Sequence, residues 1–75
     1  MDRTDLAVAE AFRDAISRSP QSQRALASEV GISETTLSRL VNGRRQLRVA
    51  VLMRLAQALG IPAGRVLDEA MEKLS

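Results

Sequence analysis

The sequence predicts an all-α domain built from five helices. Apolar residues recur at helical spacing along almost the whole chain. Phe12 is the only aromatic residue, and no long β-branched run favours a strand. Glycine, proline and Asn-Gly signals divide the 75 residues into segments of helix length. A chain of this size is expected to form a single domain, residues 1–75.

The first helix is predicted from about Asp5 to Ser19. Asp2 or Thr4 can cap its N-terminus, and Pro20 ends it because the residue before a proline avoids the α region. The expected core stripe of this helix is Leu6, Val8, Ala11, Phe12, Ala15 and Ile16.

The second and third helices are predicted at Gln23–Val30 and Glu34–Val41. Ser22 and Ser33 are good N-cap residues for them. Gly31 ends the second helix, at a position where the chain must turn with positive φ.

The last two helices are predicted at about Val49–Leu59 and Ala63–Leu74. Gly60 closes the fourth helix and Pro62 opens the fifth, where the missing N–H of proline costs nothing. The expected core stripe of the fourth helix is Val49, Leu52, Met53, Ala56 and Leu59.

The joint between the second and third helices is typical of a helix-turn-helix. Counting from Gln23 as position 1, small Ala27 is position 5, Gly31 is position 9, and Leu37 and Leu40 are positions 15 and 18. The turn has only three residues, which holds two helices at a steep angle. The expected shared core is Leu26, Val30, Ile32, Leu37 and Leu40.

Charge is distributed unevenly although the net charge is only +2. Between Thr35 and Leu67 there is no acidic residue, and this block contains Arg39, Arg44, Arg45, Arg48, Arg54 and Arg65. A cationic block of this kind is expected of a surface that binds a polyanion, and the alternative is a solvated basic face.

Composition argues against several other functions. The chain has no cysteine and no histidine, so its serines lack the usual partners for nucleophilic catalysis. We therefore expect no enzyme activity, metal, cofactor or small-molecule ligand. No apolar run is long enough to span a membrane, and the first residues do not form a signal peptide, so we expect a cytoplasmic protein without a membrane partner.

The chain resembles the Cro/C1-type (XRE-like) helix-turn-helix family, over about residues 8–69. The resemblance rests on Ser22-Gln23, Leu26-Ala27, Gly31-Ile32-Ser33, Leu37-Ser38-Arg39-Leu40, Asn42-Gly43-Arg44 and the segment Leu55-Ala56-Gln57-Ala58-Leu59-Gly60-Ile61. It implies a five-helix, lambda-repressor-like domain with a supporting helix at about 23–30 and a recognition helix at about 34–41. The implied partner is double-stranded DNA, with the recognition helix in its major groove.

The resemblance also implies roles for individual residues. The face expected to read bases consists of Glu34, Thr35, Thr36, Ser38 and Arg39. The residues expected to contact phosphates are Ser22, Gln23, Asn42, Arg44 and Arg45. Arg48 is added to them because, as a poor N-cap residue that departs from the family pattern, it is freer to reach a phosphate.

Some of these roles have plain alternatives. Glu34 can accept from cytosine N4, or it can simply favour the helix dipole. Thr36 can contact a base or only assist capping, and Arg39 can bind guanine or a phosphate. Arg45 can bind a phosphate or be solvated charge.

The sequence departs from the family pattern in two places. Ile16 and Val41 stand where many members have an Arg–Glu ion pair, so we expect an apolar contact there. Before the fourth helix, Leu47 replaces a proline and Arg48 is a poor N-cap residue, which leaves the start of that helix open.

The fifth helix carries an apolar stripe past the usual end of the domain. Its outer members, Met71 and Leu74, either form a two-fold homodimer contact or only cover the base of the bundle. A dimer would place two recognition helices on a palindromic operator.

The sequence is compatible with three functions. The first is a transcriptional regulator, specifically a repressor like the phage Cro or immunity repressors. The second is an antitoxin-like protein-interaction module that acts through the fifth helix. RNA binding is a distant third, because A-form RNA closes its major groove to a helix.

Overall fold

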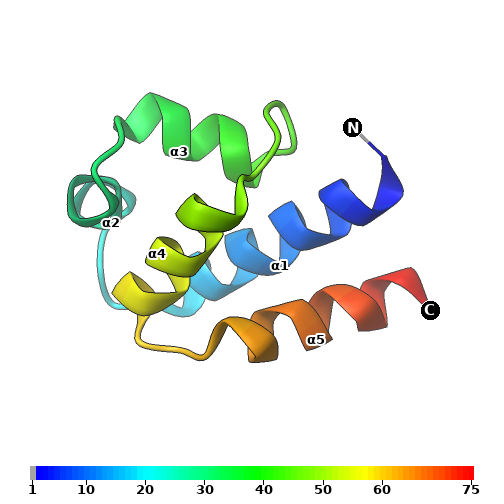
Figure 1. Cartoon of the computed structure of the whole chain (residues 1–75). Helices are drawn as coiled ribbons and strands as arrows, with labels where there is room; N and C mark the ends of the chain where they lie inside the picture. The colour runs from blue at the N-terminus through cyan, green and yellow to red at the C-terminus, as the bar shows by residue number, and fades with distance from the viewer. Residues whose placement is uncertain (1) are drawn as a thin grey trace.

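The computed structural model describes residues 2–75 and confirms the all-α fold. Within that range it contains five helices and no strand (Figure 1). The helices are α1 (Arg3–Arg18), α2 (Gln23–Val30), α3 (Glu34–Val41), α4 (Val49–Leu59) and α5 (Ala63–Leu74). The last four start and end where the sequence predicts.

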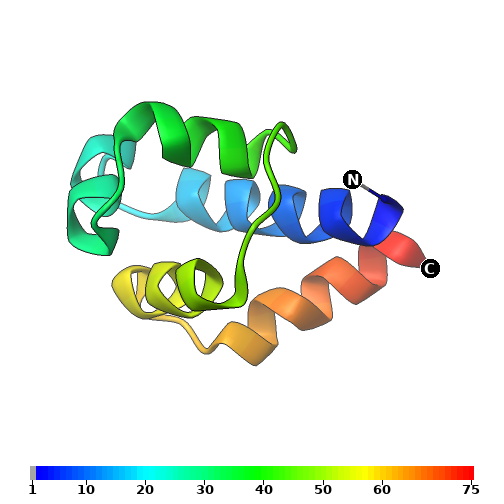
Figure 2. The same ribbon diagram turned by 45° about the horizontal axis from the view of Figure 1, so that its top comes forward.

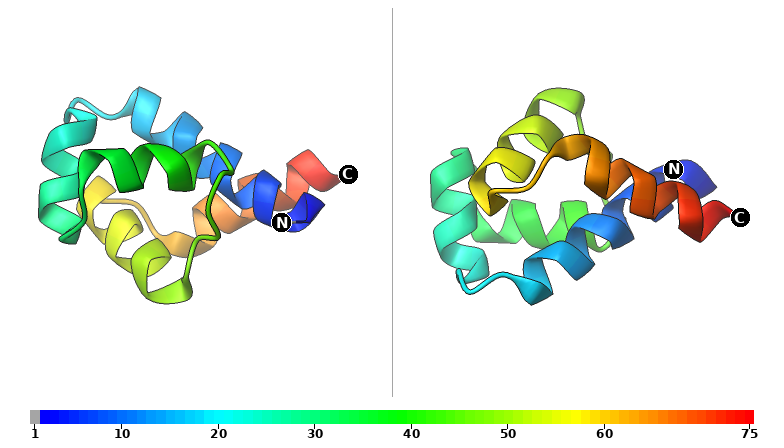
Figure 3. Two further views of the ribbon diagram at one scale, coloured as in Figure 1. Left: turned by 90° about the horizontal axis from the view of Figure 1, so that it is seen from above. Right: turned by 90° about the horizontal axis from the view of Figure 1, so that it is seen from below.

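Helix α1 runs through the centre of the bundle. In Figure 1, α3 lies above α1 and α5 lies below it, with α4 in front. The turned view in Figure 2 shows the segment after α3 crossing the bundle to reach α4. Helices α1 and α5 are antiparallel, and the Arg3 guanidinium at the start of α1 donates to the Leu74 carbonyl over 3.4 Å. Because α1 lies between them, α3 and α5 are on opposite faces of the molecule (Figure 3).

The N-terminus of α1 is set by a capping box. The Asp2 carboxylate accepts from the Asp5 N–H over 2.9 Å, and the Asp5 carboxylate accepts from the Asp2 N–H over 3.3 Å. The helix consequently begins at Arg3, two residues before the predicted start, and Asp2 rather than Thr4 is the cap.

Gly31 makes the turn of the helix-turn-helix. Its φ is 86°, positive as predicted, and the N–H groups of Gly31 and Ile32 donate to the carbonyls of Ser28 and Ala27. These two bonds satisfy carbonyls that the end of α2 would otherwise leave unpaired. The chain then enters α3 through Ser33, whose hydroxyl accepts from the Thr36 N–H over 3.0 Å.

Helix α4 begins without a side-chain cap. Its N-cap residue is Arg48, which makes no capping hydrogen bond, and the first turn contains no acidic residue. The helix still starts at Val49, as predicted.

The core is built largely from alanine. Fifteen hydrophobic residues in the described chain are buried, and seven of them are alanines. The predicted helix-turn-helix core is confirmed, since Leu26, Val30, Leu37 and Leu40 are buried and Ile32 is half-buried against it. Alanines allow helix backbones to approach closely, and Phe12 is the largest fully buried side chain, with no exposed surface.

Three predicted core residues are wrong. Val49 and Met53 are 70% and 60% exposed, and Leu6 is 47% exposed. Helix α4 has apolar residues on most of its faces, so spacing alone does not select the inward one. The structure buries Leu55, which the predicted stripe omitted, together with Ala56, which the stripe included. In α1 the buried face includes Ala7 and Ala9, which the predicted stripe omitted.

Ion pairs join α1 to α5 at the surface. The Lys73 ammonium lies 2.9 Å from the Asp14 carboxylate and 3.6 Å from that of Glu10. The hydrogen bond from Lys73 lowers the pKa of Asp14 below its usual value, and the same bond raises the pKa of Lys73.

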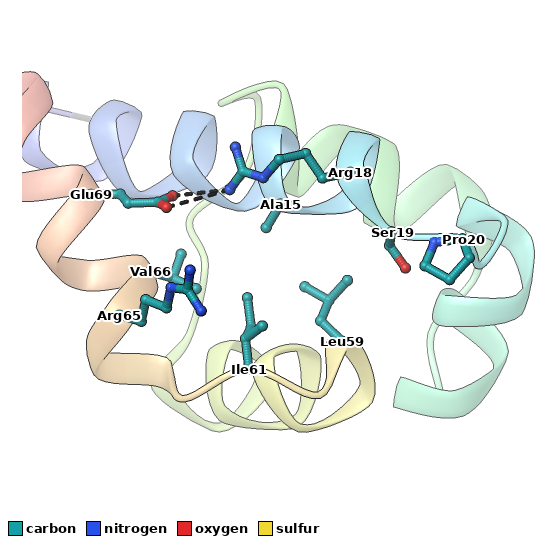
Figure 4. Close-up of a pocket in the computed structure, with 9 residues that line it drawn as sticks. All are labelled: Ala15, Arg18, Ser19, Pro20, Leu59, Ile61, Arg65, Val66 and Glu69. Carbon is teal, nitrogen blue, oxygen red and sulfur yellow. Dashed lines mark hydrogen bonds and ion pairs between the residues drawn. The ribbon is translucent and has the colours of Figure 1, made fainter.

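A further ion pair joins Arg18 and Glu69 over 3.3 Å beside a cavity of about 260 Å³ (Figure 4). Ala15, Leu59 and Val66 contribute apolar side chains to this cavity. None of the predicted DNA-binding residues lines it, so it is not the candidate site.

Candidate nucleic-acid interface

A shallow hollow separates the N-termini of α2 and α3. It measures about 350 Å³, and its lining comes from two segments that the sequence predicts to bind DNA. Ser22 and Gln23 line it from α2, and Glu34, Thr35 and Ser38 line it from α3. The fold thus brings two predicted phosphate-binding residues together with three predicted base-reading residues.

The five predicted base-reading residues differ in the exposure of their side chains. Glu34, Thr35 and Arg39 are exposed, whereas Thr36 and Ser38 are half-buried. The Thr36 hydroxyl accepts from the Ser33 hydroxyl over 2.8 Å, which is the capping role that the sequence left open. This arrangement favours Thr36 as a capping residue.

The C-terminus of α3 is closed by Asn42 and Gly43. The Asn42 side-chain amide donates to the Ser38 carbonyl over 2.8 Å, and Gly43 takes a φ of 72°. A Cβ on Gly43 would meet only the end of the exposed Leu6 side chain, which can move aside, so the positive φ is what favours glycine here. The Arg44 N–H donates to the Arg39 carbonyl over 2.9 Å, and Arg44 therefore leaves α3 in a fixed direction.

Four arginines around the end of α3 are free to bind an anion. Arg39, Arg44, Arg45 and Arg48 are all exposed. Within residues 2–75 their guanidinium groups form no ion pair or hydrogen bond. Unpaired guanidinium groups on one segment suit phosphate contacts.

Two further arginines belong to this face and were missed in the sequence. Arg24 lines the hollow beside Gln23 and Glu34, and Arg13 of α1 donates to the Asn42 Oδ1 atom over 3.4 Å. Neither lies in the cationic block between Thr35 and Leu67, which contains the other predicted DNA-binding arginines. Only the packing of α1 and α2 on α3 brings them to the site.

Comparison with known proteins agrees with this geometry. A family model described as Helix-turn-helix (HTH_3) matches residues 22–66, which is more than half of the chain. The chain belongs to the Cro/C1-type helix-turn-helix family. It is accordingly a DNA-binding transcriptional regulator and not an enzyme. A search of curated protein sequences finds no match.

Among solved structures, this helix-turn-helix protein is similar to the clp gene regulator ClgR from C. glutamicum. The two chains are 27% identical, with a TM-score of 0.89. The alignment covers 100% of this chain and 96% of the other. The similarity therefore extends over all five helices, beyond the residues that the family model matches.

Apolar residues occupy the two positions where the resemblance implies an ion pair between α1 and α3, namely Ile16 and Val41. Val41 is buried in the core cluster and Ile16 packs against that cluster, while a direct contact between the two side chains stays a prediction. The hydrogen bond from Arg13 to Asn42 supplies a polar link nearby. The C-terminal end of α3 is thus held by both kinds of contact.

The predicted dimer residues on α5 differ in exposure. Met71 is 65% exposed, whereas Leu74 is half-buried and packs against the core cluster. Leu67, which precedes Met71 by one helical turn, is 38% exposed. Leu74 therefore fits the alternative role of covering the base of the bundle, and Met71 keeps an available surface.

Within residues 2–75, no individual helix is both long and apolar enough to cross a membrane. Helices α4 and α5 pass that test only as a pair, which bends by 110° at the break between them.

Proposed function

We propose that this protein binds a palindromic operator with sequence specificity and represses transcription by occupying it, in the manner of Cro and the immunity repressors. The observation that carries the proposal is the hollow between α2 and α3, where predicted phosphate-binding and base-reading residues line one surface. Repression by occupancy requires only DNA binding, so this domain could produce it without another activity.

In the proposed complex the N-terminal half of α3 enters the major groove. Arg39 binds guanine through O6 and N7, Glu34 accepts from cytosine N4, and Thr35 contacts thymine. The exposure of these three side chains supports their roles. Ser38, whose hydroxyl accepts from the Asn42 amide over 3.3 Å, has a smaller share in reading bases.

The remaining residues hold the phosphates on either side. Ser22 and Gln23 act at the N-terminus of α2, where the free N–H groups and the helix dipole favour an anion. The second group, at and after the end of α3, consists of Asn42, Arg44, Arg45 and Arg48. Because three of these are arginines, we expect a salt slope of roughly −3 per domain from them alone.

We further propose that the protein binds the operator as a homodimer through α5. Met71 and Leu67 are the exposed apolar residues that support this contact. A two-fold dimer repeats α3 about one DNA turn away, which matches the spacing of a palindromic site.

The decisive experiment compares the affinity for a selected duplex with that for random duplex DNA over a salt series. We expect steep salt dependence and at least ~10³-fold tighter binding to the selected palindrome. Weak binding without sequence preference would contradict the proposal. That result would favour the antitoxin-like alternative, in which a protein partner binds Leu67 and Met71.

A further inference from the structure

Arg24 has no partner in the free protein although it lies within the DNA-binding surface. It is exposed on α2, and no ion pair or side-chain hydrogen bond involves it in residues 2–75. It lines the hollow that contains Glu34, Thr35 and Ser38. A second hollow beside it, of about 380 Å³, is again lined by both Arg24 and Glu34. These two side chains are the ones that the two hollows share.

Glu34 needs a nearby cation if it is to read a base. Its carboxylate is exposed at the first position of α3, the end that enters the groove in the proposed complex. Duplex DNA carries one negative charge per about 1.7 Å of its axis, so an unaccompanied carboxylate would be repelled there. Among residues 2–75, Arg24 is the only cationic residue that lines either hollow. The arginine on α3 itself is Arg39, which lies five residues after Glu34 and therefore not on the same face of the helix as Glu34.

We propose that Arg24 pairs with Glu34 when the protein binds DNA, and so orients the Glu34 carboxylate towards cytosine N4. The planar guanidinium of arginine can bind a carboxylate through two parallel N–H bonds, which fixes its direction. Arg24 is then a positioning residue for base readout, and it acts through Glu34. This inference rests on the proposed function, because it assumes that α3 enters the major groove.

In the free protein the pair is open. Arg24 and Glu34 line the same hollows, yet their charged groups do not come within 4 Å of one another. Both side chains are solvated, and an exposed ion pair gains little there. Water is displaced from the hollow when the duplex covers it, which strengthens the attraction between the two charges.

The test uses the full chain and a set of duplexes, each with one base pair of the selected site replaced. Glu34→Gln first identifies the base pair that Glu34 reads, as the position where discrimination is lost. Discrimination at that pair is then measured for Arg24→Met, which keeps the aliphatic stem of the side chain and removes its charge. Arg65→Met is the charge-matched control, because Arg65 is also exposed but lies on α5, beside the cavity near Glu69 (Figure 4). Thermal unfolding confirms that each variant is folded at the temperature of the binding assay.

We expect Arg24→Met to lose about tenfold in discrimination at the Glu34 base pair and to keep the discrimination at other pairs. In a Glu34→Gln background, Arg24→Met should change no base preference further. A uniform loss of affinity over all duplexes would overturn the proposal, since Arg24 would then contact only phosphate. An unchanged affinity profile, or a Glu34→Gln variant with intact preferences, would also overturn it. In each of these cases wild-type protein that still prefers the selected palindrome leaves the proposed function standing.

Discussion

The uncapped start of α4 gives a prediction in which stability and DNA binding change in opposite directions. The perturbation is Arg48→Ser, with Arg48→Ala as the matched control. The backbone of Arg48 has φ −71° and ψ 148°, the extended conformation that an N-cap residue needs. Serine can therefore cap the first turn of α4 without any rearrangement of the chain, and alanine cannot.

The expected gain follows from this geometry. A serine cap stabilises a helix by about 1 kcal/mol relative to alanine. For a domain of this size that corresponds to a rise in Tm of about 4–8 °C. Both substitutions also remove a cation from the positive end of the helix dipole, which adds a few tenths of a kcal/mol to each. The serine variant should therefore be the most stable of the three proteins, followed by the alanine variant and then by the wild type.

Thermal and urea unfolding, followed by circular dichroism at 222 nm, measure the free energy of unfolding of the three proteins. Salt-dependent DNA binding is measured in parallel. Both variants should bind all duplexes more weakly, and the salt slope should fall by about 1 in each because one phosphate contact is lost. If the serine variant were no more stable than the alanine variant, the assignment of Arg48 to an open N-cap position would be refuted.

Four other predictions concern the fold and the proposed site. Arg39→Ala should weaken binding to the selected site by about 1–3 kcal/mol and relax the preference at one base position, whereas Arg44→Ala should weaken binding to all duplexes alike. If the two variants behaved equally in a base-substitution series, Arg39 would be excluded as a base-reading residue. Gly31→Ala should destabilise the protein by about 1 kcal/mol through its φ of 86° alone, since a Cβ there meets nothing within 4 Å. Gly31→Asn should destabilise it less, and an alanine variant with an unchanged or higher Tm would contradict the left-handed turn. Lys73 lowers the pKa of Asp14, so this pair stabilises the fold above the usual Asp pKa of 3.8, and the stabilisation is lost as pH falls below that value. Asp14→Asn should therefore flatten the low-pH part of the profile of unfolding free energy against pH, measured by urea titration. A variant profile parallel to that of the wild type would disprove the pairing. Met71→Lys should convert a dimer to a monomer in sedimentation experiments and weaken operator binding, while a wild-type protein that is monomeric on the operator would refute the α5 contact.

The helix boundaries could be predicted because their signals are local. Ser22, Ser33, Gly31, Gly60 and Pro62 each act on the backbone within one turn, and each stands where the structure needs it. The start of α1 was misplaced because the capping box depends on the pairing of Asp2 with Asp5, and Thr4 offered a competing cap.

Burial and the full binding surface depended on contacts between distant segments. Val49 and Met53 fit a helical stripe as well as Leu55 does, and only the packing of α4 on α2 and α5 decides which face is covered. Arg24 and Arg13 lie in segments that contain both acidic and basic residues, so their sequence positions alone do not indicate an anion-binding surface. The fold brings one beside Glu34 and the other to Asn42.

The alanine-rich core also bears on how the protein can evolve. Seven buried positions are Ala7, Ala9, Ala11, Ala15, Ala27, Ala56 and Ala70. Most single-nucleotide changes of an alanine codon add volume, polarity or a backbone constraint, and a close-packed interior accepts none of these cheaply. In such a core, shortening a side chain removes few contacts, whereas enlarging one destabilises the packing. Mutational drift should therefore be tolerated mainly on the surface, where the residues proposed to read DNA lie, and related proteins could change their operators while keeping the same interior.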